Sequence, residues 1–301
     1  MSIIARMAAL KTGTGNGAFP KIPRAKFIRT LEQRIADPDS IRQAVSSLCG
    51  PASLLRSVLL DNPEMYVRYA IDMYERGQAK LGKLDVEPSS DCRECDTKEK
   101  VAAVDWVTLA SLRDSENDVF DYDDVDDLVG GITMPEDLAD WFEKCGYVNA
   151  RNNTSVLLTE GRDTLQEALD CHAAGMRTCL LIEAEMIDGD GKGNAVFANH
   201  WVMLGDSWGL RPGLDVGWVG FRGDGYGGGS WTDDAADPWV GGSPGNHVID
   251  DRVPRGNGDE VDLTLWSWGD WYRTNKFGPM SWKSFEKRFH GYVAARFRFA
   301  Y

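Results

Sequence analysis

Residues 43–56 read QAVSSLCGPASLLR, and this stretch decides the expected fold. Cys49 is followed by Gly-Pro and then by an apolar run whose leucines and valine recur at helical spacing. Proline is tolerated in the first turn of a helix, where its missing N–H would have no intrahelical partner. The pattern therefore predicts a buried helix that begins at Cys49 and ends near Leu60.

A thiol at the start of that helix is well placed for nucleophilic chemistry. The partial positive charge of a helix N-terminus stabilises the thiolate, which is the reactive form of cysteine. Gln43 lies six residues upstream and can direct an amide N–H at the oxygen of a carbonyl under attack. We therefore predict Cys49 as the nucleophile and Gln43 as an oxyanion donor. The alternative for Cys49 is an inert buried thiol.

The pattern Gln-x5-Cys-Gly-Pro resembles the papain-like cysteine proteases. The form LCGPASLL resembles bacterial relatives of that superfamily, including bacteriocin-processing peptidases and cysteine-protease or amidase effector toxins. This resemblance implies an α+β fold, in which a helical half carries the nucleophile and packs on an antiparallel sheet half that carries a histidine. It also implies a third polar residue on the next strand.

The stretch 199–205, NHWVMLG, supplies the expected histidine. Of the four histidines, His200 alone lies among apolar neighbours inside a predicted strand, residues 195–204. The resemblance implies that His200 acts as the base and then as the acid of the reaction, and we expect Trp201 beside it to contact substrate. The alternative for His200 is a core residue with satisfied hydrogen bonds.

Residues 265–269 read LWSWG and resemble the Asn-Ser-Trp-Gly strand end of papains, except that Trp266 replaces the orienting Asn. A tryptophan side chain cannot accept a hydrogen bond from an imidazole N–H. Ser267 and Asp262 are therefore the candidates for a third catalytic residue, beside a Cys–His dyad oriented by solvent or backbone. We expect Trp268 to shield the pair from water and to contact substrate.

Composition narrows the classes of partner. The chain has 301 residues, 43% of them hydrophobic, and a net charge of −14, which argues against nucleic acid or an anionic membrane as the main partner. No apolar stretch approaches the roughly 18 residues of a membrane span, and the N-terminus has no long apolar signal region. We expect a protein made in the cytoplasm without a Sec signal.

Cofactor chemistry is not expected. Six cysteines in a chain of this length do not form a disulfide framework. A lone Cys92-x2-Cys95 pair is weak evidence for zinc, so we expect two exposed loop cysteines, no metal and no cofactor.

The expected organisation is a mobile arm, residues 1–24, followed by one catalytic domain, residues 25–301. The resemblance implies that the site lies in a cleft between the helical half and the sheet half. An insertion at 206–258, rich in Gly, Trp and Asp, is expected to line this cleft and select the substrate, the alternative being a self-packed loop. Helices are expected at 26–36, 65–76, 101–112, 134–145 and 164–174, and strands at 178–187, 195–204, 261–266 and 292–299.

The expected reaction is attack by Cys49 on an amide carbonyl, through a thioester intermediate. The substrate is a peptide bond, a protein glutamine side chain or a cell-wall amide, and the resemblance to effector toxins favours a protein target. That resemblance also implies a cognate immunity or chaperone protein and export by a specialised secretion system. The alternative is a non-catalytic binding protein on a papain-like scaffold.

Overall fold

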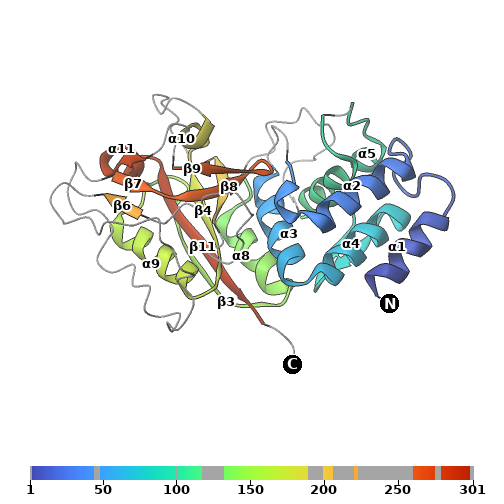
Figure 1. Ribbon diagram of the computed structural model, residues 1–301, viewed down its shortest axis with the longest axis horizontal. Coiled ribbons are helices and arrows are strands. Elements are labelled where there is room, and N and C mark those ends of the chain that lie inside the picture. Colours follow the sequence, from blue (N-terminus) through green and yellow to red (C-terminus); the bar gives the residue numbers. More distant parts are fainter. Residues whose placement is uncertain are drawn as a thin grey trace, which may run out of the picture. The chain divides into compact units, whose positions relative to one another are not determined.

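The computed structural model describes residues 2–43, 48–98, 100–116, 132–188, 199–205, 220–222, 260–274 and 279–298. Helices and antiparallel strands are mixed in these ranges, so the predicted α+β class is confirmed (Figure 1). The chain divides into two compact units. Unit 1 holds residues 1–150, 266–270 and 297–301, and unit 2 holds residues 151–265 and 271–296.

Unit 1 is mainly helical. Helix α3 is buried from Cys49 through Leu59 and packs against α4, α8 and the π-helical turn η2. A helix buried on all sides is the centre of its unit, which agrees with its apolar sequence. The helical elements of unit 1 are α1 (Ile3–Thr12), α2 (Arg24–Ala36), η1 (Pro38–Ser40), α3 (Cys49–Asp61), α4 (Pro63–Arg76), α5 (Ser90–Glu94), α6 (Ala103–Asp105), η2 (Trp106–Ala110), α7 (Ser111–Ser115) and α8 (Pro135–Lys144).

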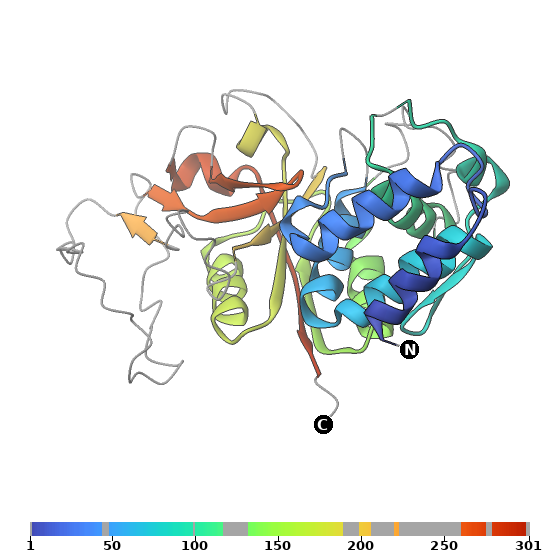
Figure 2. The same ribbon diagram turned by 45° about the vertical axis from the view of Figure 1, so that its right-hand side comes forward.

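The expected mobile arm is instead a folded part of unit 1. Helix α1 packs against α2 and α4 (Figure 2). Its Met7 and Leu10 are buried. Phe19 is fully buried, and its ring stacks with that of Tyr74 on α4. The many Gly and Lys residues suggested mobility, but the apolar residues between them bury their surface against α4.

Among the described residues, the strands form three sheets. The largest sheet has six strands in the order β3-β11-β4-β5-β8-β9. The second has three strands in the order β10-β7-β6, and the third is formed by β1 and β2. The strands are β1 (Ala79–Leu81), β2 (Leu84–Val86), β3 (Tyr147–Thr154), β4 (Arg177–Ile182), β5 (His200–Leu204), β6 (Gly220–Arg222), β7 (Glu260–Asp262), β8 (Thr264–Ser267), β9 (Asp270–Arg273), β10 (Met280–Ser281) and β11 (Phe289–Phe297). Three helices accompany them: α9 (Arg162–Ala173), α10 (Glu185–Asp188) and α11 (Trp282–Glu286).

Two predicted strands differ from the structure. The strand expected at 261–266 is split at Leu263 into β7 and β8, which belong to different sheets. The backbone N–H of Leu263 donates to the hydroxyl of Thr274 instead of to a neighbouring strand, which accounts for the break. The strand expected at 178–187 ends at Ile182, and α10 follows.

The insertion at 206–258 lies outside the described residues except for β6, which pairs with β7 in antiparallel register. Its expected contact with substrate therefore also lies outside them. The described part of the histidine strand, β5, pairs with β4 so that His200 faces Ile182 and Trp201 faces Leu181. On its other side β5 neighbours β8 in the sheet.

Candidate active site

Cys49 is the first residue of α3, as the sequence predicted. Leu48 occupies the N-cap position and has no polar side chain to offer the helix start. The first turn, Cys-Gly-Pro-Ala, carries no carboxylate, so nothing in it neutralises the positive end of the helix dipole. Cys49 is 2% exposed. The dipole favours a thiolate at this position, whereas burial by itself favours the neutral thiol.

Gly50 is needed where α3 begins because Thr133 covers that turn. A Cβ atom at position 50 would lie 2.3 Å from Oγ1 and 2.5 Å from Cβ of Thr133. Both residues are buried, and a threonine side chain is too short to swing aside. The Cys-Gly pair therefore belongs to a tightly packed helix start.

We expect Gly50→Ala to destabilise the protein by roughly 1–3 kcal/mol, the usual cost of overpacking a core. Urea unfolding of Gly50→Ala, Thr133→Gly and the double variant measures the effect. The double variant should be less destabilised than the sum of the two single variants, because removing the Thr133 side chain removes the clash. Additive single effects would contradict this account of Gly50.

Trp266 has a packing role in unit 1. Its indole Nε1–H donates to the backbone carbonyl of Asp39 at 2.8 Å. The guanidinium of Arg56, a buried residue of α3, lies 4.9 Å from the centroid of the Trp266 ring and bonds to the Asp39 carboxylate at 2.7 and 3.0 Å. Trp266 therefore attaches the end of β8 to the segment that precedes Gln43.

The turn after β8 contains an unusual backbone. Trp268 has a φ of 47° and Gly269 a φ of 77°, both in the left-handed region. For a bulky residue such as Trp268 this conformation costs about 1–3 kcal/mol and is often found at functional sites. A Cβ at position 269 would lie 3.2 Å from the carbonyl oxygen of Ile41, so Gly269 allows the turn to approach that segment closely. Ser267, one residue earlier, is buried.

His200 begins β5 in unit 2 and is 4% exposed. Burial lowers its pKa to about 3, because desolvation disfavours the imidazolium. The ring is therefore neutral near pH 7 and has a nitrogen that can accept a proton. The imidazolium that would result needs a nearby negative charge to be stable in such surroundings.

Two predicted site residues in unit 2 have other roles. Trp201 is 1% exposed and belongs to the core, so its expected contact with substrate is not supported. The carboxylate of Asp262 is bound by Arg273 on β9, whose Nε donates at 2.9 Å and whose Nη2 makes a second contact. Because Asp262 lies on β7, it belongs to the three-stranded sheet and not to the sheet of His200.

Unit 1 thus holds four predicted site residues, and unit 2 holds the other three. Those of unit 1 are Gln43, Cys49, Ser267 and Trp268; those of unit 2 are His200, Trp201 and Asp262. Gln43 is 2% exposed and follows directly after a segment bound to Asp105 and Arg34. The sequence did not indicate Asp105 or Arg34, because an ion pair between positions 71 residues apart leaves no local signal.

The Cys92-x2-Cys95 pair differs from the expected exposed loop. Cys92 is buried in α5, where its carbonyl accepts from the indole N–H of Trp106 at 3.0 Å, and Cys95 is half-buried. Neither belongs to a group of three or more His, Cys, Asp or Glu side chains able to hold a metal, since the described ranges contain no such group.

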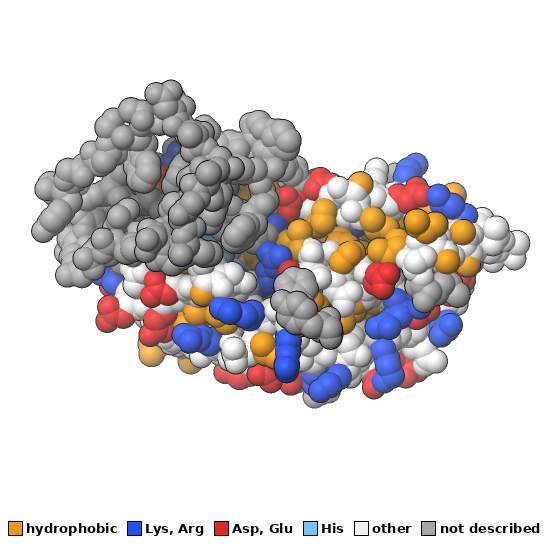
Figure 3. Space-filling model, turned by 60° about the horizontal axis from the view of Figure 1, so that its bottom comes forward, with side chains coloured by type: hydrophobic (Ala, Val, Ile, Leu, Met, Phe, Trp, Pro, Cys, Tyr) orange, Lys and Arg blue, Asp and Glu red, His pale blue; other side chains and the backbone are white. Residues whose placement is uncertain are grey.

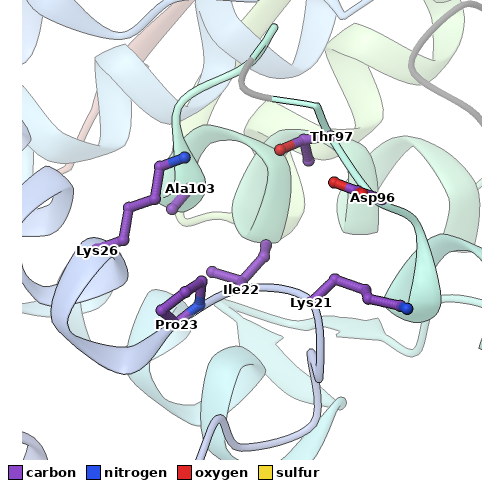
Figure 4. A pocket seen from close by; sticks show the side chains of 7 residues that line it. All are labelled: Lys21, Ile22, Pro23, Lys26, Asp96, Thr97 and Ala103. Atoms are coloured by element: carbon purple, nitrogen blue, oxygen red, sulfur yellow. The ribbon is translucent and has the colours of Figure 1, made fainter.

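Unit 1 has a cavity of about 210 Å³ (Figure 4). None of the predicted site residues lines it. Its lining combines two lysine side chains with apolar and polar groups: Lys21, Ile22, Pro23, Lys26, Asp96, Thr97 and Ala103. Elsewhere, acidic and basic side chains are interspersed over the described surface that Figure 3 presents. Within the described ranges, no helix has the length and apolar character needed to cross a bilayer.

Comparison with known proteins gives no match for this chain among protein-family models, curated sequences or solved structures.

Proposed function

We propose that this protein is a cysteine-nucleophile amide hydrolase in which Cys49 is the nucleophile and His200 the proton carrier. The observation that carries the proposal is the position of Cys49, at the N-terminus of a buried helix whose first turn bears no carboxylate. The positive end of a helix favours the thiolate, which is the nucleophilic form of cysteine. The proposal includes a papain-like fold, for which the mixture of helices with an antiparallel sheet gives support at the level of fold class.

In the proposed reaction, His200 accepts the thiol proton as the Cys49 sulfur attacks the amide carbon. The carbonyl electrons move to oxygen, and the Gln43 amide and the Cys49 backbone N–H stabilise the oxyanion. The C–N bond then breaks, and the imidazolium gives its proton to the departing amine. A thioester remains on Cys49, and water, deprotonated by His200, hydrolyses it to a carboxylic acid and the free thiol.

The proposal requires His200 and Cys49 to come within hydrogen-bond reach during the reaction. A thiolate would then supply the negative charge that the buried imidazolium needs. Because burial lowers the pKa of His200 to about 3, the ring by itself stays neutral near pH 7 and becomes charged only when a negative charge lies beside it.

Two residues near the expected third catalytic position have other partners. Trp266 is engaged with Asp39, and Asp262 is engaged with Arg273. Ser267, buried at the end of β8, is the remaining side-chain candidate for orienting His200. We infer an amide in a protein as the substrate, following the resemblance to protein-directed effector enzymes.

Selective alkylation tests the proposal directly. We expect iodoacetamide at pH 7 to modify Cys49 at least about 10-fold faster than Cys95, although Cys95 is the more exposed, because the thiolate is the reacting species. Peptide mass spectrometry gives both rates in one sample. His200→Ala should slow the Cys49 reaction and leave that of Cys95 unchanged.

Equal or slower labelling of Cys49 would count against the enzyme and favour the alternative, a binding protein on the same scaffold. In that case His200→Ala would change neither rate.

A further inference from the structure

The segment 37–43 leads into Gln43 and is held by a buried ion pair in unit 1. Asp105, the last residue of α6, is fully buried. Its Oδ1 accepts from Arg34 Nε at 2.9 Å, and its Oδ2 accepts from Arg34 Nη2 at 2.6 Å. The same Oδ2 accepts from the backbone N–H of Arg42 at 3.0 Å. One carboxylate thus binds a helix side chain and the peptide group between Ile41 and Arg42, one residue before Gln43.

Arg34 makes a second attachment to this segment. Its Nη1 donates to the hydroxyl of Ser40 at 3.1 Å, and that hydroxyl donates to the carbonyl of Asp37 at 2.6 Å. Arg34 and Asp105 therefore bind the segment at Ser40 and at Arg42, and the bond from Ser40 to Asp37 closes a turn within it. The bonds from Arg34 to Ser40 and from Arg42 to Asp105 are charge-assisted, the kind of hydrogen bond that fixes geometry most firmly.

Stability alone is a weak reason for such a pair. Burial raises the pKa of Asp105, which shows that its charge is costly there, while the hydrogen bonds from Arg34 oppose that rise. Apolar replacements of buried ion pairs are often neutral or stabilising. Asp105 also immediately precedes the π-helical turn η2, a feature frequently found at functional sites.

We propose that Asp105 is a positioning residue for Gln43. By accepting the Arg42 N–H, it fixes the backbone from which Gln43 presents its amide to the oxyanion. This inference rests on the proposed function and adds to it the group that sets the oxyanion donor in place. A donor of this kind is effective only within a few tenths of an ångström of its required position.

A matched pair of double variants isolates the bond to Arg42. Arg34→Met with Asp105→Asn removes both charges but keeps an acceptor for the Arg42 N–H. Arg34→Met with Asp105→Leu has nearly the same shape and no acceptor. Urea unfolding establishes that both are folded, and Arg34→Met with Asp105→Ala is a second acceptor-free variant should the Leu variant be unfolded.

We expect kcat on a peptide amide to be about 10- to 100-fold lower in the Leu variant than in the Asn variant, with KM unchanged. In a Gln43→Ala background this difference in kcat should disappear, because Asp105 acts through Gln43. Hydrogen exchange of the Arg42 amide should be at least about 10-fold faster in the Leu variant.

Unchanged Arg42 exchange, or a kcat difference that persists without the Gln43 side chain, would overturn the positioning role. If the parent chain hydrolyses no amide while Arg42 exchange still depends on Asp105, the failure lies with the proposed function. The hydrogen bond from Arg42 to Asp105 would then hold the segment without a catalytic role, and the positioning role of Asp105 would be wrong together with the proposed function.

Discussion

Cys49→Ala is expected to abolish amide hydrolysis, and His200→Ala is expected to lower kcat by up to about 10⁶-fold, as for other nucleophile–base pairs that act as a unit. Without the sulfur no thioester forms, and without the imidazole no group in the proposed reaction accepts the thiol proton. A peptide-amide assay measures kcat for each variant. Circular dichroism and urea unfolding show whether each remains folded.

Because the two residues act on the same step, the double variant should be no slower than the worse single variant. Cys95→Ala is the matched control, since it removes a half-buried thiol of unit 1 and should leave kcat unchanged. Near wild-type turnover in Cys49→Ala or His200→Ala would exclude that residue from the reaction.

Much of unit 1 could be predicted because its helices carry local signals. The Cys-Gly-Pro start of α3 and the spacing of its apolar residues were sufficient to place that helix. For α4, Asn62 caps the first turn, Pro63 opens the helix and Gly77 ends it with a φ of 72°. In each case the chemistry that sets the boundary lies within a few residues of it.

Features set by distant partners could not be predicted. Glycine and lysine made residues 1–24 look mobile, whereas Phe19 and Leu10 are buried by contacts with α4 and its neighbours. Similarly, the strand break at Leu263 depends on Thr274, which the alternation of apolar residues does not reveal. Such tertiary contacts override local propensity.

In the candidate site, too, features with a local sequence pattern could be predicted and features set by distant partners could not. The sequence placed Cys49 at a helix start and His200 in a strand, because both positions have local patterns. It indicated that Trp266 could not orient a histidine, but not that its indole binds Asp39. Only the fold shows that Trp266 attaches the end of β8 to the segment that precedes Gln43.

Gln43→Ala is expected to lower kcat by about 10²–10³ with little change in KM, the usual cost of losing one oxyanion donor. The donor matters mainly in the transition state, when the carbonyl oxygen carries its full charge, so ground-state binding changes little. Steady-state kinetics on a peptide amide separates the two parameters. Gln33→Ala, an exposed glutamine on α2, is the control and should alter neither.

The same substitution should also slow both halves of the reaction. Formation of the thioester and its hydrolysis each pass through a tetrahedral oxyanion, so pre-steady-state measurements with an activated ester should show both steps slowed in Gln43→Ala. A large rise in KM with kcat preserved would instead assign Gln43 to substrate binding. Slowing of thioester formation alone would mean that Gln43 acts on the nucleophile and not on the oxyanion.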